Sequence, residues 1–256
     1  NRNSFAGIAF EGLGNCSMMH ESPSPNVSKR LILQNNLEVL GWSNLPGKID
    51  ALFNICNFLS EDTVEYRRVI EEEATNIAKT LSALFKPEVP LETAGSYSPD
   101  EFLNYLVKIS LKIFRNKFLL ENVAYEVLVE LVENILQRLL MEGTNKPEDG
   151  TGKKNETALG NDSPMKNLNS LMLRILETCN PNTMFQLLFD LLIKHRKTCG
   201  FSKFIGLIIK CILKLTKILD ALLPNLDVSK LFLKFHLYVC ECFNENLKNN
   251  DDLGLK

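Results

Sequence analysis

The chain has 256 residues, of which 45% are hydrophobic and 23% are charged, and its formal net charge is -2 at pH 7. A chain of this length and composition can bury a sizeable core and belongs to the ordinary globular class. It lacks the basic excess typical of nucleic-acid-binding domains, and no run approaches the roughly 18 uninterrupted apolar residues of a membrane span.

The seven cysteines are an odd number, and most of them fall inside apolar helical runs. This placement favours small buried hydrophobic side chains in a reducing compartment over disulfides or metal ligands. We therefore predict a cytoplasmic chain without a metal site.

The first half of the chain predicts an arm followed by five helices. Residues 1–27 hold Gly, Ser, Pro and Asn without a sustained period, which indicates a flexible arm or linker. Apolar periodicity then predicts helices over about 28–40, 48–59, 61–85, 98–114 and 119–141. Within the third, Glu71, Glu72 and Glu73 form a charge run that we interpret as a solvated face.

Residues 142–162 contain almost nothing apolar and four glycines. Such a segment cannot offset the entropy lost on ordering, so we expect a disordered loop. This loop divides one helical array into a first part, 28–141, and a second part, 163–256.

The second part carries the strongest helical signal. From Ser163 to Leu247, four runs have their Leu, Ile and Phe at i, i+3, i+4 and i+7, and breaks fall at Asn180-Pro181, Cys199-Gly200 and Pro224-Asn225. Short connections make neighbouring helices antiparallel. The sequence predicts an all-α fold of about nine helices, a HEAT-type α-solenoid built from antiparallel pairs.

Three groups of residues in this part resemble the C-terminal TOG-like domain of the Minispindles/ch-TOG family of microtubule polymerases. They are Leu173-Arg174-Ile175-Leu176-Glu177 with Asn180; Lys203-Phe204 with Lys210-Cys211-Ile212 and Lys214-Leu215; and Lys230-Leu231-Phe232-Leu233 with His236. The similarity runs from about Leu168 to Tyr238, and a weaker one extends back to about Leu40.

The resemblance implies partners and a location. The partners would be tubulin and microtubules or an adaptor of the TACC type, and the location would be the cytoplasm and cytoskeleton, at centrosomes and the spindle. The family pattern begins another helix at Asp251–Lys256, so the resemblance also implies that the last repeat of the array is truncated.

Two sets of residues are candidate contacts. TOG domains use a tryptophan in an intra-hairpin loop to contact tubulin, so the resemblance points to Trp42 with Asn44 and Lys48. The alternative is a loop tryptophan that covers the end of a hairpin. The second set, Lys203, Lys210, Lys214 and Lys217, has spacings of seven, four and three, which place it on one side of a helix.

The lysine stripe lies in a stretch, Leu191 to Leu219, that has no Asp or Glu. It would attract an acidic protein surface or a phosphate backbone, and it is equally compatible with an ordinary solvated helix face. Because no aromatic residues interleave with the lysines for base stacking, we expect no nucleic-acid partner.

No catalytic motif is present: the sequence has no P-loop, dinucleotide fingerprint or inward carboxylate cluster. His236 and Cys240 share a helix face, but without an orienting group or an oxyanion donor we interpret His236 as a core histidine. We predict a protein that is not an enzyme and uses no cofactor.

We expect a non-catalytic module that helps recruit or regulate a microtubule polymerase at plus ends, centrosomes and spindle poles. The alternative is a purely structural or adaptor-docking HEAT-repeat scaffold that does not bind tubulin. The two differ in whether Trp42, Asn44, Lys48 and the ends of adjacent hairpins line up along one exposed edge.

Overall fold

The computed structural model describes residues 25–42, 44–61, 63–87, 99–144, 164–196 and 203–252. These residues form helices and contain no strand, which confirms the all-α prediction. The helices are α1 (Pro25–Trp42), α2 (Leu45–Ser60), α3 (Val64–Phe85), α4 (Pro99–Ile113), α5 (Lys117–Glu121), α6 (Tyr125–Thr144), α7 (Pro164–Thr178), α8 (Pro181–His195), α9 (Lys203–Thr216), α10 (Leu219–Leu222), the 3-10 helix η1 (Leu223–Asn225) and α11 (Val228–Asp252).

Polar side chains cap the starts of several helices. The Asn44 side chain accepts a hydrogen bond from the Gly47 amide at 3.0 Å and begins α2. The Asn180 side chain accepts from the Asn182 amide at 2.9 Å, with a proline at the next position, and begins α8. Each cap satisfies an amide that has no partner inside its helix, so these sequence signals fix where the helices start.

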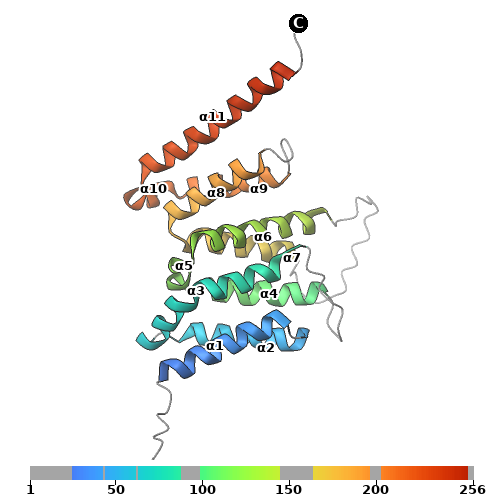
Figure 1. Cartoon of the computed structure of the whole chain (residues 1–256), viewed down its shortest axis with the longest axis vertical. Helices are drawn as coiled ribbons and strands as arrows, with labels where there is room; N and C mark the ends of the chain where they lie inside the picture. Colours follow the sequence, from blue (N-terminus) through green and yellow to red (C-terminus); the bar gives the residue numbers. More distant parts are fainter. Residues whose placement is uncertain are drawn as a thin grey trace, which may run out of the picture.

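The long helices pack as two layers (Figure 1). The first layer contains α2, α4, α7 and α9, each packed against the next, and the second contains α1, α3, α6, α8 and α11. Contacts between α1 and α2, α6 and α7, and α8 and α9 join the layers into antiparallel pairs. This is the stacked arrangement expected of a HEAT-type solenoid.

One continuous apolar core runs between the layers from Leu33 in α1 to Leu215 in α9. Burial of this apolar surface is the main stabilising term of the stack. The described side chains of α11 supply only partly buried residues to the core, among them Leu231 and Tyr238. The last helix is therefore the least enclosed of the long helices.

Two predicted helices are divided. The helix expected over 119–141 becomes α5 and α6, because the chain bends at Asn122–Ala124, where Asn122 Nδ2 donates to the Phe118 carbonyl at 2.9 Å and the Ala124 amide donates to Thr75 Oγ1 at 3.0 Å. The run after Lys203 also breaks, at the end of α9, and continues as α10 and η1. Nine long helices remain in the described part, as predicted.

The predicted domain borders stay predictions. Residues 1–24 and 145–163 lie outside the described residues. They include most of the arm that we predict over 1–27 and most of the loop that we predict over 142–162. At their borders, α1 begins at Pro25 and α6 continues to Thr144. Among the described helices, none is both long enough and apolar enough to span a membrane.

Candidate partner interface

Successive helices alternate in direction, so the stack has two distinct edges. The last residues of α1, α3, α6 and α8 and the first residues of α2, α4, α7 and α9 lie at one edge, on the right in Figure 1. We call this the hairpin edge. The short helices α5 and α10 lie at the opposite edge.

Trp42, Asn44 and Lys48 lie at the hairpin edge, on the first helix pair. Trp42 is the last residue of α1, and its side chain lies outside the part that the structure describes. Asn44 is exposed and Lys48 is half-buried, and the Lys48 amide donates to the Asn44 carbonyl at 3.0 Å. The cap at Asn44 thus holds this turn in line with the ends of the other first-layer helices.

The four lysines predicted to share one side of a helix are all exposed. Helix α9 begins with Lys203 at the hairpin edge and crosses the first layer, and Lys217 follows its last turn at the opposite edge. At about 1.5 Å per residue, the stripe spans roughly 20 Å. None of the four lysines forms an ion pair with a described side chain, so their charge is available to a partner.

The structure does not bring the two predicted sets together. Trp42, Asn44 and Lys48 belong to the α1–α2 pair, whereas the lysine stripe belongs to α9. In the first layer, α4 and α7 lie between α2 and α9.

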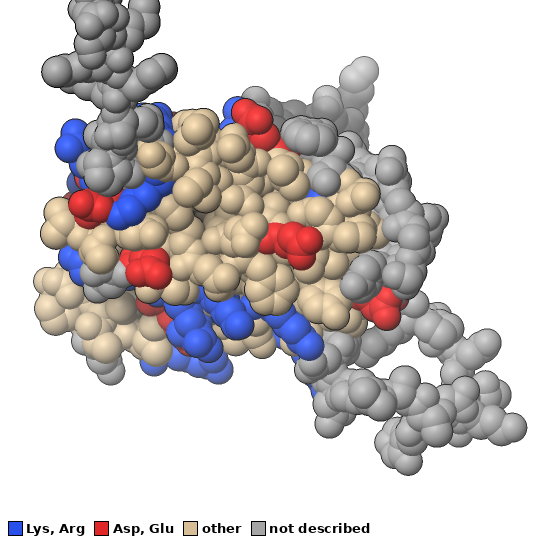
Figure 2. Space-filling view, turned by 90° about the horizontal axis from the view of Figure 1, so that it is seen from below, with Lys and Arg blue, Asp and Glu red and all other residues tan. Residues whose placement is uncertain are grey.

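The stripe is part of a larger basic surface on the first layer. Exposed lysines on α4 and α7 project from the side of each helix that no neighbour covers, and with the stripe they form what we call the basic face: Lys108, Lys112, Lys166, Lys203, Lys210, Lys214 and Lys217. Figure 2, viewed from the α1–α2 end, shows one group of Lys and Arg along the lower edge of the view and others at its left, where Asp and Glu lie beside them. Sequence reasoning missed Lys108 and Lys112 of α4 and Lys166 of α7 because these two helices are distant from α9 in the sequence. The spacing of four between Lys108 and Lys112 was a signal for that pair alone.

Basic residues on the second layer are largely neutralised. Lys86 pairs with Glu130 at 2.9 Å, Lys194 with Glu133 at 2.7 Å and Lys234 with Asp190 at 2.6 Å. Paired charges attract a distant partner weakly, so these three residues contribute less to long-range attraction than the four lysines of the stripe.

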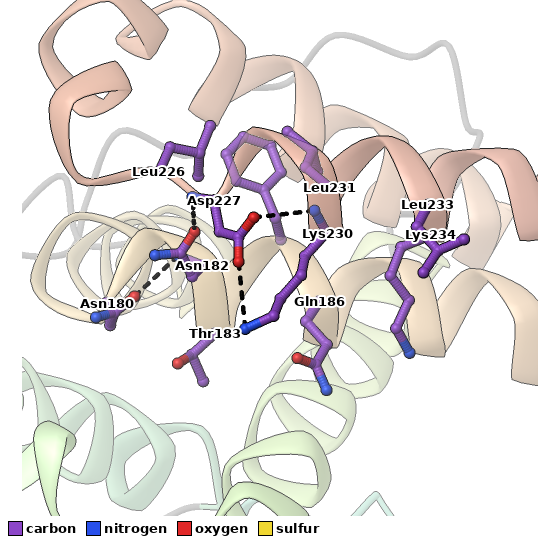
Figure 3. Close-up of a pocket in the computed structure, with 11 residues that line it drawn as sticks. Asn180, Asn182, Thr183, Gln186, Leu226, Asp227, Lys230, Leu231, Leu233 and Lys234 are labelled. Carbon is purple, nitrogen blue, oxygen red and sulfur yellow. Dashed lines mark hydrogen bonds and ion pairs between the residues drawn. The ribbon is translucent and has the colours of Figure 1, made fainter.

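A pocket of about 430 Å³ lies between the first turns of α8 and α11, at the opposite edge (Figure 3). Asn182 joins its two sides: its Nδ2 donates to the Asn225 carbonyl at 2.8 Å, and its Oδ1 accepts from the Asp227 amide at 2.7 Å. Lys230 pairs with Asp227 at 3.2 Å, and its backbone amide and ammonium hold the pKa of that carboxyl below its usual value. These polar groups bind one another, so we assign the pocket a structural role in seating α11 on α8.

Among the residues that the structure describes, the cysteines and His236 do not form a recognisable reactive centre. Cys179 and Cys211 are buried, and burial raises the pKa of each thiol to about 12, so both are protonated at neutral pH. Cys240 Sγ lies 3.3 Å from His236 Nε2. His236 is exposed rather than in the core, so its interpretation as a core histidine was wrong. Within the described ranges, no three His, Cys, Asp or Glu side chains are grouped so as to hold a metal ion.

Two plant proteins, both called MOR1, are distantly similar to the chain. The protein from Arabidopsis thaliana is 28% identical over 198 residues, which cover 72% of this chain and 9% of the relative. The protein from Oryza sativa subsp. japonica is 23% identical over 238 residues, 86% of this chain and 11% of the relative. The chain thus spans about a tenth of the length of these curated relatives, which are proteins of the Minispindles/ch-TOG family. No family model and no solved structure matches it.

Proposed function

We propose that this chain is a non-catalytic module of a microtubule-associated protein and helps to recruit or regulate a microtubule polymerase. It acts in the cytoplasm, at plus ends, centrosomes and spindle poles, by binding tubulin or an adaptor of the TACC type. The distant similarity to MOR1 and the two-layer helical stack support this proposal.

The basic face is the observation that carries the proposal. Its lysines project from one layer, and those of α9 have no ionic partner among the described side chains. An acidic surface such as that of tubulin would be attracted over about 8–10 Å at physiological salt. The turn at Trp42, Asn44 and Lys48 is a second candidate contact, since it lies in line with the ends of the neighbouring pairs.

The alternative is a structural or adaptor-docking HEAT-repeat scaffold that does not bind tubulin. It is favoured by the direction of the stripe, which crosses the first layer instead of following the hairpin edge. TOG-type contacts come from loops along a single edge, and here only Lys203 of the stripe lies at that edge.

Binding to tubulin tests the proposal. The folded chain is co-sedimented with microtubules and run with unpolymerised tubulin on size exclusion, at low and moderate salt. One variant carries Gln at Lys210, Lys214 and Lys217. A matched variant carries Gln at Arg67, Arg68 and Lys79, which are exposed on α3 in the second layer and change the net charge equally.

We expect binding that weakens with salt and is about tenfold weaker in the α9 variant. Three exposed charge contacts of roughly 0.5 kcal/mol each sum to about the 1.4 kcal/mol that corresponds to a factor of ten. The α3 variant is expected to bind like the wild type. Absence of binding by a chain with a helical circular-dichroism spectrum would overturn direct tubulin binding and leave the scaffold.

A further inference from the structure

A groove of about 440 Å³ lies between α1 and α3, which pack against each other in the second layer (Figure 1). From α1 it is lined by Gln34, Leu37 and Glu38, and from α3 by Asn76, Lys79, Thr80 and the fully buried Glu73. Hydrogen bonds from Arg30 and Gln34 to the Glu73 carboxylate, at 2.7 and 2.8 Å, join the two helices. The groove is thus bounded on both sides by helices that the structure describes.

The buried carboxylate of Glu73 fixes how two amide side chains of the groove are turned. Gln34 Nε2 donates to it at 2.8 Å and Asn76 Nδ2 at 2.7 Å. An ionised carboxylate only accepts hydrogen bonds, so each amide must turn its nitrogen toward Glu73 and keep its oxygen free. Neither oxygen accepts a hydrogen bond from a described residue. The groove therefore offers two oriented amide oxygens to a ligand.

The charged groups of the groove favour a basic ligand. Glu38 and Lys79 line it, are exposed, and form no ion pair within the described ranges. Beside them, Arg30 pairs with Glu72 and Glu73. Three carboxylates thus stand against two basic groups, and the amide oxygens add further acceptors. A guanidinium group, which is cationic and has only donors, matches this set best.

The length of the groove suits an extended chain. Its lining on α3 runs from Glu73 to Thr80, which is roughly 10 Å along the helix at about 1.5 Å per residue. An extended chain advances about 3.3 Å per residue, so about three residues would fit. A peptide in this conformation also has unpaired backbone amides that can donate to side-chain oxygens.

We propose that this groove binds a short extended segment of a partner protein and takes up one Arg side chain of that segment. The guanidinium donates to the oxygens of Gln34 and Asn76 and pairs with Glu38, and its aliphatic stem lies against Leu37. The groove shares no residue with the basic face and belongs to the other layer. The proposal therefore goes beyond the proposed function and concerns a partner of opposite charge.

Selection from a displayed library of random nine-residue peptides tests the proposal on the folded chain. The tightest Arg-containing peptide is synthesised with a fluorescent label, and its Kd is read by fluorescence anisotropy. We expect a class of selected peptides that share an Arg. Replacing that Arg by Gln is expected to weaken binding at least tenfold, because several charge-assisted hydrogen bonds are lost.

Three variants of the chain locate the site. Glu38→Gln is expected to weaken binding of the Arg peptide about fivefold and to leave binding of its Gln counterpart unchanged. Glu71→Gln removes the same charge from an exposed position of α3 outside the groove and is the matched control, expected to bind like the wild type. Lys79→Gln is expected to tighten binding about twofold, because it removes a like charge. Opposite effects of two neutralising changes cannot come from a general loss of structure.

Two results would overturn the proposal. One is the absence of an Arg-containing class among the selected peptides. The other is an Arg peptide whose affinity is unchanged by both Glu38→Gln and Lys79→Gln. Tubulin binding by Glu38→Gln keeps this proposal apart from the proposed function, since the lysines of the basic face stay in place. Weaker peptide binding with tubulin binding retained supports a separate site, whereas equal loss of both would overturn it.

Discussion

The carboxylate of Glu73 ties α1 to α3. It has no exposed surface, and it accepts hydrogen bonds from Arg30 Nε at 2.7 Å, Gln34 Nε2 at 2.8 Å and Asn76 Nδ2 at 2.7 Å. Burial acts to raise the pKa of this carboxyl, but the hydrogen bonds from Asn76, Gln34 and Arg30 outweigh it, so the pKa is lowered. A buried charge is tolerated here because all its partners are present.

Replacing Glu73 by Ala is expected to lower the free energy of unfolding by about 3 kcal/mol, because Arg30 and Gln34 lose a buried acceptor. Urea unfolding followed by circular dichroism measures the change. Glu72→Ala, in the same run but exposed, is the matched control and is expected to cost under about 0.5 kcal/mol. Equal losses in the two variants would contradict the role assigned to Glu73.

The lowered pKa of Glu73 also predicts a pH dependence. The pKa of this carboxyl is lower in the folded chain than in the unfolded chain, where it is near 4.5. The ionised carboxylate therefore stabilises the fold at a pH above the unfolded-state pKa. This stabilisation is lost as the pH falls through the folded-state pKa. The wild type is thus expected to lose stability below about pH 4.5 more steeply than Glu73→Gln. If the free energy of unfolding changed with pH equally in both proteins, other carboxyls would dominate the loss of stability in acid.

At the scale of elements, α11 is held by polar and aromatic contacts together with a few partly buried apolar residues. Asp190 of α8 accepts from Tyr125 of α6 and from Lys234 of α11, both at 2.6 Å. Burial and the hydrogen bond to Asp190 raise the pKa of Tyr125, so its hydroxyl stays a donor at any physiological pH. Asp190 therefore links three helices of the second layer.

Asp190→Ala is expected to loosen α11 without unfolding the stack. Loss of two hydrogen bonds, about 1–2 kcal/mol together, would speed amide hydrogen exchange in α11 roughly tenfold while α3 and α6 stay protected. Hydrogen-exchange mass spectrometry measures this. Glu177→Ala, which removes a surface pair with Arg174 at 3.7 Å, is the control and is expected to change nothing. Faster amide exchange in all helices of the Asp190→Ala variant, and not only in α11, would argue against a local role for Asp190.

At the scale of the molecule, stability is expected to be graded along the stack. Helices α3, α4, α6 and α7 pack against neighbours on both sides within the layers, and α6 also contacts α9. The described contacts of α11 are concentrated on α8. In a solenoid each repeat is stabilised mainly by its neighbours, so the interior pairs have more to lose on opening than the last helix.

Native-state hydrogen exchange is expected to show this gradient, with the slowest amides in α3, α6 and α7 and the fastest in α11. Uniform protection along the chain would mean that the array unfolds as one cooperative unit and would contradict the gradient.

Several features could be predicted from the sequence because they depend on residues within one helix. The period of apolar residues and the breaks at Asn180-Pro181 and Pro224-Asn225 determined an all-α stack with nine long helices. The spacing of Lys203, Lys210, Lys214 and Lys217 predicted a shared side of one helix, and all four side chains are exposed, the first three on α9 and Lys217 just after it. Helical geometry alone fixes both relationships.

Other features were decided only by the packing of helices that are distant in the sequence. Glu73 became buried because α1 lies over it, while its neighbours Glu71 and Glu72 stayed in solvent. Lys108, Lys112 and Lys166 joined the α9 lysines because α4, α7 and α9 share a layer, and α11 kept an apolar side exposed because no described first-layer helix covers it. Periodicity shows which side of a helix is apolar or charged, but burial and charge pairing depend on what the neighbouring helix places against that side, which tertiary structure alone determines.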